Sequence, residues 1–508
     1  MSGHALLSRI ALLLVMLTTA CTASTGDLPG TDTTVQVDST ITPASSPAVV
    51  VESVPASQTP IPETAAPPLG EEDNTLPLPH YNITATLNYS QHFLSVDERI
   101  SYTNRSPEPI LNLRLMVDPL YYPGVFDLTG MSWGAGQAIE NYTVETGQFE
   151  IPLNTPLLPG ESVSLSLSYE MNLPSPVPSA QIRPIPFGYT NRQTNLVDWY
   201  PFIPPYIAGQ GWLAHQAGFF GEHLVYDQAD FDINIRVEDA PPGLVVAASA
   251  PDRQEGEWHR YEHTSARNFA WSASPEYQVF TTTVGDTTIN SYAFLYHASA
   301  GEAVLNTTAE ALSLYNELYG PYPRRLLSVI EADFLDGMEY DGLYFLSNGF
   351  YNLYQGTPGE YLIAIAAHET AHQWFYASVG NDQAMEPWLD EALCTYQERI
   401  YYERLHPEAL DWWWAYRVNY YEPHGWVNGS IYNPEGYRAY RDAVYLNGAT
   451  FLEELRNQIG DPAFFAFLQD YALQNRGTIA TSERFFEILS QHTDKDLSDL
   501  VGKFFMQD

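Results

Sequence analysis

Apolar and polar positions alternate along much of the chain between residues 80 and 297. The apolar members recur with a period of two, which is the period of a strand that buries one face. In the three clearest segments they are Tyr81, Ile83, Ala85, Leu87 and Tyr89; Val163, Leu165, Leu167 and Tyr169; and Phe231, Ile233, Ile235 and Val237. Loops rich in proline and glycine separate these segments. The pattern predicts a β-rich N-terminal domain over residues 78–297.

The period changes to that of an α-helix after residue 297. One stripe of the segment 301–320 carries Val304, Ala311, Leu312, Tyr315 and Leu318. Gly320, followed by a proline, is the expected end of this helix. A strand-like run, "LLSVIEAD", comes next, and helical patterns then dominate. We therefore predict a mainly α-helical domain over residues 298–508 and an α+β protein with more than one domain.

The first 77 residues follow neither pattern. Residues 10–20, "IALLLVMLTTA", are apolar and follow Arg9; as a helix they rise about 16 Å, too short to span a bilayer. The run has the length of a signal-peptide core and ends in "LTTAC", which resembles a bacterial lipoprotein processing box. We expect a signal peptide over residues 1–21, a lipid on Cys21 and an extracytoplasmic, membrane-anchored protein. The alternative is an ordinary secretory signal with an incidental cysteine, and hence a secreted protein.

Residues 22–77 are rich in Thr, Ser and Pro, and no Lys or Arg occurs between Arg9 and Arg99. Such a composition cannot bury enough apolar surface to fold, so we expect a disordered linker. As a coil it would reach on the order of 40 Å and would act as a tether.

The chain is strongly acidic, with 62 Asp plus Glu against 22 Lys plus Arg and a formal net charge of −40. Repulsion between such a surface and phosphate groups argues against binding nucleic acid or anionic lipid. Cys21 and Cys394 are the two cysteines of the sequence, so no disulfide framework is expected. Nothing in the composition indicates a required protein partner.

The segment "YLIAIAAHETAHQWFYASVG" contains the motif "HETAH" at His368–His372. Upstream, Thr357, Pro358 and Glu360 have the spacing of an N-cap, a first helical residue and the glutamate of a capping box. Gly380 is typical of a helix end. We predict one helix between these signals, with both histidines inside it, one turn apart on the same face.

Two histidines so placed can both bind one Zn²⁺, which needs a third protein ligand and an open position. Glu391 is the candidate, in "WLDEALCTY", where Pro387 is the expected first residue of a second helix. A carboxylate among apolar neighbours needs a partner, whereas the alternative is a solvated acid on a helix surface. Glu369 lies beside the histidines, where it can take a proton from the attacking water. The pattern predicts one zinc ion per chain, held by His368, His372 and Glu391.

These residues resemble the gluzincin aminopeptidases of the aminopeptidase N type, in which eighteen residues separate HExxH from the glutamate ligand, as they do here. Upstream, "DGMEYDGL" resembles the family's G-x-M-E-N loop, which implies that Glu339 binds the free α-amine of the substrate. Downstream, "YLNGATFLEEL" resembles the Y-x-K-G-A helix, which implies that Tyr445 stabilises the oxyanion. The resemblance covers roughly residues 80–508. It implies a saddle-like β-domain before a thermolysin-like, mainly α catalytic domain.

The resemblance implies a zinc metallopeptidase, and most directly an aminopeptidase acting on peptides with a free N-terminus. The alternatives are an endopeptidase or dipeptidase with the same zinc site, an epoxide hydrolase, and a tethered binding protein without activity. A binding protein would have no need of the base Glu369, so the intact motif argues against the last alternative.

The sequence departs from the family pattern at three positions, where Tyr340, Asp390 and Asn447 replace Asn, Asn and Lys. Only 63 residues follow Tyr445, so we expect a short form without the large C-terminal helical domain of many members, and a more open site. Whether the protein acts only as an exopeptidase is therefore left open.

Two other features have structural explanations. The aromatic run "DWWWAYRVNYY" at residues 411–421 is expected to pack between helices; the alternatives are the lining of an apolar side-chain pocket and a platform for a sugar. Cys394 is expected to be a small buried apolar residue.

Overall fold

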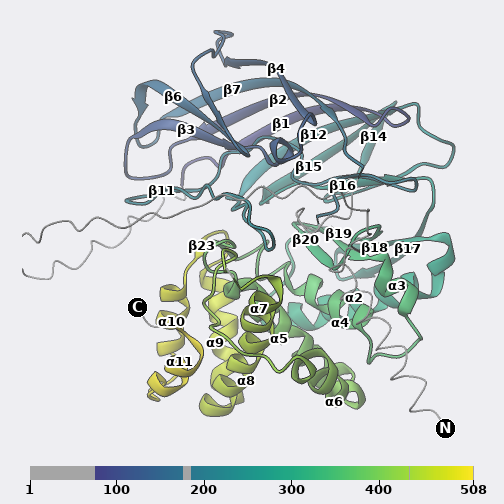
Figure 1. Cartoon of the computed structure of the whole chain (residues 1–508), viewed down its shortest axis with the longest axis vertical. Coiled ribbons are helices and arrows are strands. Elements are labelled where there is room, and N and C mark those ends of the chain that lie inside the picture. Colours follow the sequence, from purple (N-terminus) through teal and green to yellow (C-terminus); the bar gives the residue numbers. More distant parts are fainter. Residues whose placement is uncertain (1–74, 176–184, 434, 507–508) are drawn as a thin grey trace, which may run out of the picture. The chain divides into compact units, whose positions relative to one another are not determined.

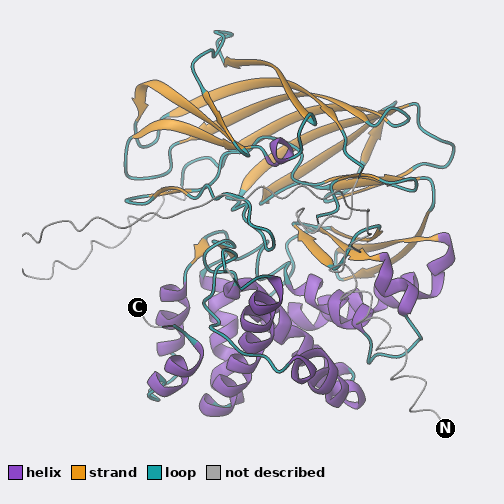
Figure 2. Ribbon diagram, viewed as in Figure 1, coloured by secondary structure: helices purple, strands orange, loops and turns teal. Residues whose placement is uncertain are grey.

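The structure is a computed structural model that describes residues 75–175, 185–433 and 435–506. Figure 1 shows strands in the earlier part of the chain and helices in the later part, and Figure 2 separates the two by colour. The predicted signal peptide, Cys21 and nearly all of the predicted linker lie outside the described residues.

The largest sheet has the strand order β14-β15-β12-β1-β2-β7-β4. Its strands are β1 (His80–Asn88), β2 (Phe93–Thr103), β4 (Phe126–Trp133), β7 (Ser162–Asn172), β12 (Ala229–Glu238), β14 (Arg253–Glu255) and β15 (Trp258–Ala266). β1 pairs in parallel with β12 and antiparallel with β2, so Ile83 lies between Ile233 and Glu98. The apolar side chains predicted to share one face of β1 are buried from Tyr81 to Leu87.

Smaller sheets complete the β-rich part of the chain. The first has the order β13-β16-β9-β8, the second β3-β6-β5, and the third contains only β10 and β11. Their strands are β3 (Ile110–Met116), β5 (Thr143–Glu145), β6 (Gln148–Leu157), β8 (Gly188–Tyr189), β9 (Thr194–Leu196), β10 (Tyr206–Ile207), β11 (Gly211–Trp212), β13 (Val245–Ala248) and β16 (Trp271–Ser274). We call residues 75–175 and 185–276 the β-rich domain.

A five-stranded sheet of order β17-β18-β19-β21-β20 leads into the helical part. Its strands are β17 (Tyr277–Val284), β18 (Thr287–Phe294), β19 (Leu326–Ala332), β20 (Gly337–Tyr340) and β21 (Leu343–Ser347). β19 is the strand predicted from "LLSVIEAD", and it is buried along its whole length. This sheet contains strands from both sides of the predicted domain boundary at residue 297. The prediction could not show this, because alternation indicates strands but not the sheet that each strand joins.

Helices form most of the second apolar core, whose buried members are Phe220 and residues from β18 onward. They are α2 (Ala298–Tyr319), α3 (Asn348–Leu353), α4 (Tyr361–Ala371), α5 (Trp388–Leu405), α6 (Leu410–Trp412), α7 (Tyr437–Arg441), α8 (Gly448–Ile459), α9 (Asp461–Gln474), α10 (Ser482–Ser490) and α11 (Ser498–Phe504); the short strands β22 (Gly380–Asn381) and β23 (Ile479–Ala480) pair in parallel. α2 ends as predicted, with Gly320 as its C-cap at φ 90°. The predicted α+β class, β-rich first and mainly helical afterwards, is confirmed.

Among the described residues, none of the helices combines the length and apolar character needed to cross a membrane.

Candidate metal centre and active site

Helix α4 carries the two histidines and begins later than predicted. Glu360, not Thr357, is its N-cap, with an extended backbone at φ −145°. The Glu360 carboxylate accepts hydrogen bonds from the main-chain N–H of Gln355 at 2.7 Å and of Thr357 at 3.0 Å. Because Glu360 bonds back in this way, residues 357–360 form a capping loop instead of the first turn. The predicted start at Pro358 is therefore wrong by three residues.

The end of α4 also differs from the prediction. The helix ends at Ala371, well before Gly380, and His372 is its C-cap. His372 still has helical dihedral angles, φ −60° and ψ −15°, so the one-turn spacing from His368 is kept. The predicted position of His372 inside a longer helix is wrong, but the shared face that the metal requires is present.

Three predicted ligands converge in the interior. The Nε2 atoms of His368 and His372 lie 3.1 Å apart. Glu391, in the first turn of α5, places Oε2 3.2 Å from Nε2 of His368 and 3.5 Å from Nε2 of His372. The ligand atoms of all three residues lie within 4.8 Å of one another, and all three side chains are buried. α5 begins at Trp388, one residue after the predicted Pro387.

The other imidazole nitrogens are fixed by acceptors. Nδ1 of His368 donates to Oε1 of Glu398 at 2.9 Å, and Nδ1 of His372 donates to the carbonyl of Phe375 at 3.1 Å. Both Nε2 atoms are therefore left with lone pairs directed at the common centre, as metal-binding histidines require. This donor set of two imidazoles and one carboxylate fits a zinc ion.

Glu398 belongs to a buried network that the sequence analysis did not find. Its carboxylate accepts from Nε1 of Trp413 at 2.8 Å and from two nitrogens of Arg417 at 2.7 and 2.9 Å. Burial would raise the pKa of Glu398, but Arg417 and His368 lower it. The aromatic run at 411–421, which contains the π-helical turn Trp413–Val418, therefore packs as expected and also supports the acid behind His368.

The three ligands stabilise one another electrostatically. Burial would lower the pKa of His368, yet hydrogen bonds to Glu391 and Glu398 raise it to about 9. Burial would raise the pKa of Glu391, but the two histidines hold it below its ordinary value. The carboxylate of Glu391 is thus stabilised by positive charge beside it. A divalent cation at this position would supply such a charge.

Glu369 has the environment of a general base. Its side chain is 4% exposed, and Oε2 has no hydrogen-bond partner among the described residues. Burial raises its pKa to about 8, although His372 and His368 act in the opposite direction. A carboxylate with a free oxygen and a pKa near neutrality is suited to proton transfer.

Glu339 and Tyr445 reach the same site from separate elements. Glu339 lies on β20, where Oε1 accepts from Nε2 of Gln383 at 2.9 Å; burial raises its pKa, opposed by His372. Tyr445 lies in the π-helical turn Asp442–Asn447 and donates to Oε1 of Glu391 at 2.6 Å. The structure thus brings all six predicted zinc-site residues together.

Two more acids lie near the ligand cluster. The sequence analysis missed Glu222 and noted Asp390 only as a departure from the family pattern. Asp390 is fully buried, and its Oδ2 has no partner among the described residues. Glu222 comes from a loop of the β-rich domain, where burial and the charges of Glu391 and Glu339 raise its pKa. Asp390 was visible as a departure from the family pattern, whereas Glu222 lies in no motif and only the fold shows its position.

The other departures lie outside this cluster of acids, whereas Cys394 lies against His372. Tyr340 is 3% exposed and packs into the β-rich core, with its hydroxyl 3.5 Å from Oδ2 of Asp198. Asn447 donates to the carbonyl of Gly425 at 2.9 Å. Cys394 is fully buried, and burial raises the pKa of its thiol.

Known proteins with similar sequences are peptidases. Residues 303–504 match the Peptidase family M1 domain. Aminopeptidase M1-B of Oryza sativa subsp. japonica is 24% identical over 234 residues, 43% of this chain and 27% of that protein. Probable aminopeptidase 2 of Sulfurisphaera tokodaii is 25% identical over 156 residues, 28% of this chain and 20% of that protein. The chain thus spans about a quarter or less of the length of these relatives.

Solved structures share the fold over a larger part of the chain. The M1 zinc metallopeptidase of Deinococcus radiodurans superposes with a TM-score of 0.59 at 19% identity, over 86% of this chain and 95% of that one. A mutant of an M1 zinc metallopeptidase from the same organism, bound to a Tyr-Ser-Ala substrate, gives a TM-score of 0.60 at 19% identity over the same shares. Residues 303–504 are thus similar to the Peptidase family M1 domain, the chain shares the fold of M1 zinc metallopeptidases, and the resemblance to the gluzincin aminopeptidases is confirmed.

Proposed function

We propose that this protein is a zinc metallopeptidase that removes N-terminal residues from peptides. The observation that carries the proposal is the convergence of His368, His372 and Glu391 beside Glu369, whose Oε2 has no partner among the described residues. The names of the relatives support it, since the rice protein is called an aminopeptidase and the Deinococcus protein a zinc metallopeptidase.

One zinc ion would be held by His368, His372 and Glu391. When bound, zinc polarises a substrate carbonyl and lowers the pKa of a water molecule to about 7. A second buried group, Glu339, His372 and Asp390, could also hold a metal. It shares His372, whose Nδ1 already donates to Phe375, so one lone pair would have to serve two ions. A single ion per chain therefore fits these residues best.

Glu369 would act as the general base and then as the general acid. Its free Oε2 would take a proton from the attacking water and pass it to the leaving amine, so the proton lost by the nucleophile reappears on the product. Burial raises the pKa of this carboxylate, so it holds a proton more readily between the two transfers than an exposed glutamate would.

Tyr445 would donate a hydrogen bond to the oxyanion that forms from the scissile carbonyl. Its hydroxyl donates to Glu391 at 2.6 Å, so it already points at the ligand cluster. Burial raises its pKa, so the phenol stays protonated and can donate. One such donor is typically worth about 3 kcal/mol in the transition state.

Glu339 would bind the free α-ammonium group of the substrate, with Glu222 facing it from the β-rich domain. Glu339 is buried and Glu222 is half-buried, their charges interact, and Oε2 of Glu222 has no partner among the described residues. A bound ammonium group would compensate these charges and would set the cut one residue from the N-terminus.

A panel of aminoacyl anilides and their N-acetylated counterparts tests this function. An aminopeptidase cleaves only the free amines, loses activity with a chelator and regains it with Zn²⁺. Equal cleavage of the acetylated set would indicate an endopeptidase instead. Zinc binding without cleavage of any peptide would contradict the peptidase proposal and favour the epoxide hydrolase or the binding protein.

Two variants separate the proposed roles. Glu369→Gln should retain zinc and lose turnover, because only the proton acceptor is removed. Glu339→Ala should lose the preference for free amines. Full turnover of the first variant, or an unchanged preference in the second, would contradict the corresponding role.

We also propose that the protein is an extracytoplasmic lipoprotein, anchored through Cys21. The support is the apolar run at residues 10–20 and the small residues before this cysteine. Metabolic labelling with radioactive palmitate, with Cys21→Ser as the control, tests the anchor. Release of unlabelled protein into the medium would favour plain secretion.

A further inference from the structure

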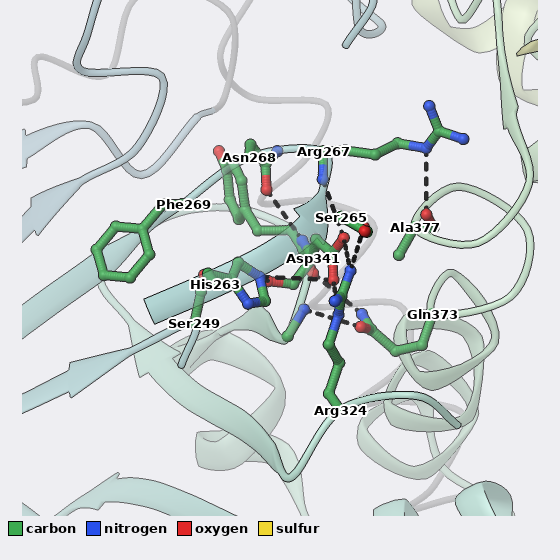
Figure 3. Close-up of polar contacts among 12 residues, drawn as sticks. Ser249, His263, Ser265, Arg267, Asn268, Phe269, Arg324, Asp341, Gln373 and Ala377 are labelled. Carbon is green, nitrogen blue, oxygen red and sulfur yellow. Dashed lines mark hydrogen bonds and ion pairs between the residues drawn. The ribbon is translucent and has the colours of Figure 1, made fainter. Parts of the chain in front are cut away.

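The side-chain amide of Gln373 connects the end of helix α4 to the turn that follows Glu339. It follows His372 directly and is fully buried. Its Nε2 donates to the carbonyl of Tyr340 at 3.0 Å, and its Oε1 accepts from the N–H of Gly342 at 3.0 Å (Figure 3). Tyr340 follows Glu339 directly. The side chain of Gln373 therefore connects the segment that carries the metal ligand His372 to the segment that carries Glu339, the proposed amine anchor.

Asp341 lies between those two hydrogen bonds and is held by the β-rich domain. Its carboxylate accepts two bonds from Arg324, at 2.7 and 2.8 Å, and one from the main-chain N–H of Arg267 at 3.0 Å. Its own N–H donates to Oδ1 of Asn268 at 3.0 Å, and its carbonyl accepts from Nε2 of His263 at 3.1 Å. The turn after Glu339 is therefore fixed by three residues from the end of β15 and the loop that follows.

The side chain of Arg267 fixes the turn after His372. The guanidinium group is fully buried and donates to the carbonyl of Tyr376 at 2.7 Å. It also donates to the carbonyl of Ala377 at 3.2 Å, as Figure 3 shows. It also reaches the carbonyls of Tyr226 and Thr478, both at 2.8 Å. A cation beside the carbonyls that follow a helix C-terminus is favourable because of the helix dipole.

That turn also contains the acceptor that orients His372. The carbonyl of Phe375 accepts from Nδ1 of His372, one residue before the first carbonyl that Arg267 binds. Tyr376 has an unusual φ of 153°, so the turn is strained and needs outside contacts to hold it. A Cβ at Gly380 would overlap the guanidinium group, so the chain is shaped closely around Arg267.

We propose that Arg267 and Gln373 are positioning residues: Arg267 holds the turn that orients His372 for the metal, and Gln373 holds Glu339 at a fixed distance from it. The β-rich domain then contributes to the geometry of the active site, because Arg267 belongs to it. The inference rests on the proposed function for the roles of His372 and Glu339.

The competing explanation is that these bonds only stabilise the junction between domains. Gln193 provides a matched control, because it is a fully buried glutamine at the same junction. Its Nε2 donates to the hydroxyl of Tyr277 at 2.7 Å, and its Oε1 accepts from the N–H of Asp333 at 2.7 Å. Gln193 thus joins β9 to the five-stranded sheet without contacting the metal ligands or the residues beside Glu339.

The first experiment compares Gln373→Met with Gln193→Met. Both variants lose three side-chain hydrogen bonds, among them one from Tyr322 to Gln373 and one from Gln193 to the carbonyl of Glu331, and keep the side-chain volume. We expect Gln373→Met to raise KM for free-amine substrates at least tenfold with a smaller change in kcat, and to lose most of the preference over N-acetylated substrates. Gln193→Met should keep both values. An unchanged preference in Gln373→Met, or the same change in Gln193→Met, would overturn the proposal.

The second experiment measures the affinity of the purified protein for Zn²⁺ by competition with a chromophoric chelator, and so needs no activity. Arg267→Lys keeps the charge but cannot reach several carbonyls at once, and we expect a 10- to 100-fold weaker affinity. The same affinity as the wild type would overturn the role of Arg267. If this variant does not fold, the Gln373→Met comparison decides. A wild type that binds no zinc would instead contradict the proposed function.

Discussion

The carboxylate of Glu369 lies directly against the main chain of Gly337, so closely that a Cβ at position 337 would overlap Oε1. Gly337 is the first residue of β20, the strand that carries Glu339. The base is therefore confined between α4 and β20, with Oε1 against the strand and Oε2 without a hydrogen-bond partner among the described residues. The absence of a side chain at position 337 is what permits this arrangement.

Gly337→Ala should reduce activity while the metal remains bound. The added methyl group would displace Glu369, and a shift of about 1 Å in a reacting group can cost on the order of 100-fold in rate. Steady-state kinetics and zinc content measure the two effects. The control is Gly130→Ala, where a Cβ has nothing within 4 Å. Wild-type kcat/KM in Gly337→Ala would show that the contact does not position the base.

The sequence predicted the ligand cluster well because its geometry is largely local. A spacing of four on a helix places His368 and His372 on one face whatever surrounds them. Glu391 was predicted from its apolar neighbours on the next helix, Glu339 and Tyr445 were assigned by resemblance, and the fold brings all three to that face. These motifs identified the residues without giving any distance.

The parts that were predicted wrongly or missed depend on contacts that the sequence does not display. The start of α4 was misplaced because the side chain of Glu360 bonds back to Gln355 and Thr357. Glu222 is distant in sequence from every motif and reaches the site through the fold of another domain. Glu398 was overlooked because its partner Arg417 lies in a run that reads as aromatic packing.

Tyr445→Phe should lower kcat by roughly 100-fold with little change in KM. The variant loses one donor worth about 3 kcal/mol in the transition state and no group that contacts the amine. Kinetics on a free-amine substrate measure this. Tyr471→Phe is the control, because its buried hydroxyl has no partner among the described residues. Equal kcat values for Tyr445→Phe and the wild type would exclude oxyanion stabilisation by Tyr445.

Glu398→Gln should weaken zinc binding by 10- to 100-fold, since the carboxylate orients His368 and increases its basicity. It should also destabilise the fold, because Arg417 would lose its buried partner, a change that typically costs about 3–5 kcal/mol. Chelator competition and chemical denaturation measure the two effects.

Glu331→Gln is the matched control for this prediction, because Glu331 is a fully buried acid that pairs with His297 away from the cluster. It should affect stability alone. Equal zinc affinities for Glu398→Gln and Glu331→Gln would contradict the role of Glu398 behind His368.

The pH dependence of stability should depend on His263, which donates to Asp341 in the junction between domains. Burial, with Arg324 nearby, lowers its pKa from 6.5 to about 4. The folded protein therefore holds this imidazole neutral, whereas the unfolded chain binds a proton once the pH falls below 6.5. The contribution to the free energy of unfolding is complete above pH 6.5 and is lost as the pH falls to 4.

The expected loss is about 3.5 kcal/mol, because the pKa of His263 falls by about 2.5 on folding and each step of one in pKa corresponds to about 1.4 kcal/mol. His263→Gln keeps a donor for the Asp341 carbonyl but cannot titrate, so its free energy of unfolding should fall less between pH 6.5 and 4. Denaturant titrations of chelator-treated protein measure the difference, with His259→Gln on the same strand as the control. Parallel pH profiles for His263→Gln and the wild type would show that His263 is not the group that titrates, because the other acids of the junction are common to both proteins.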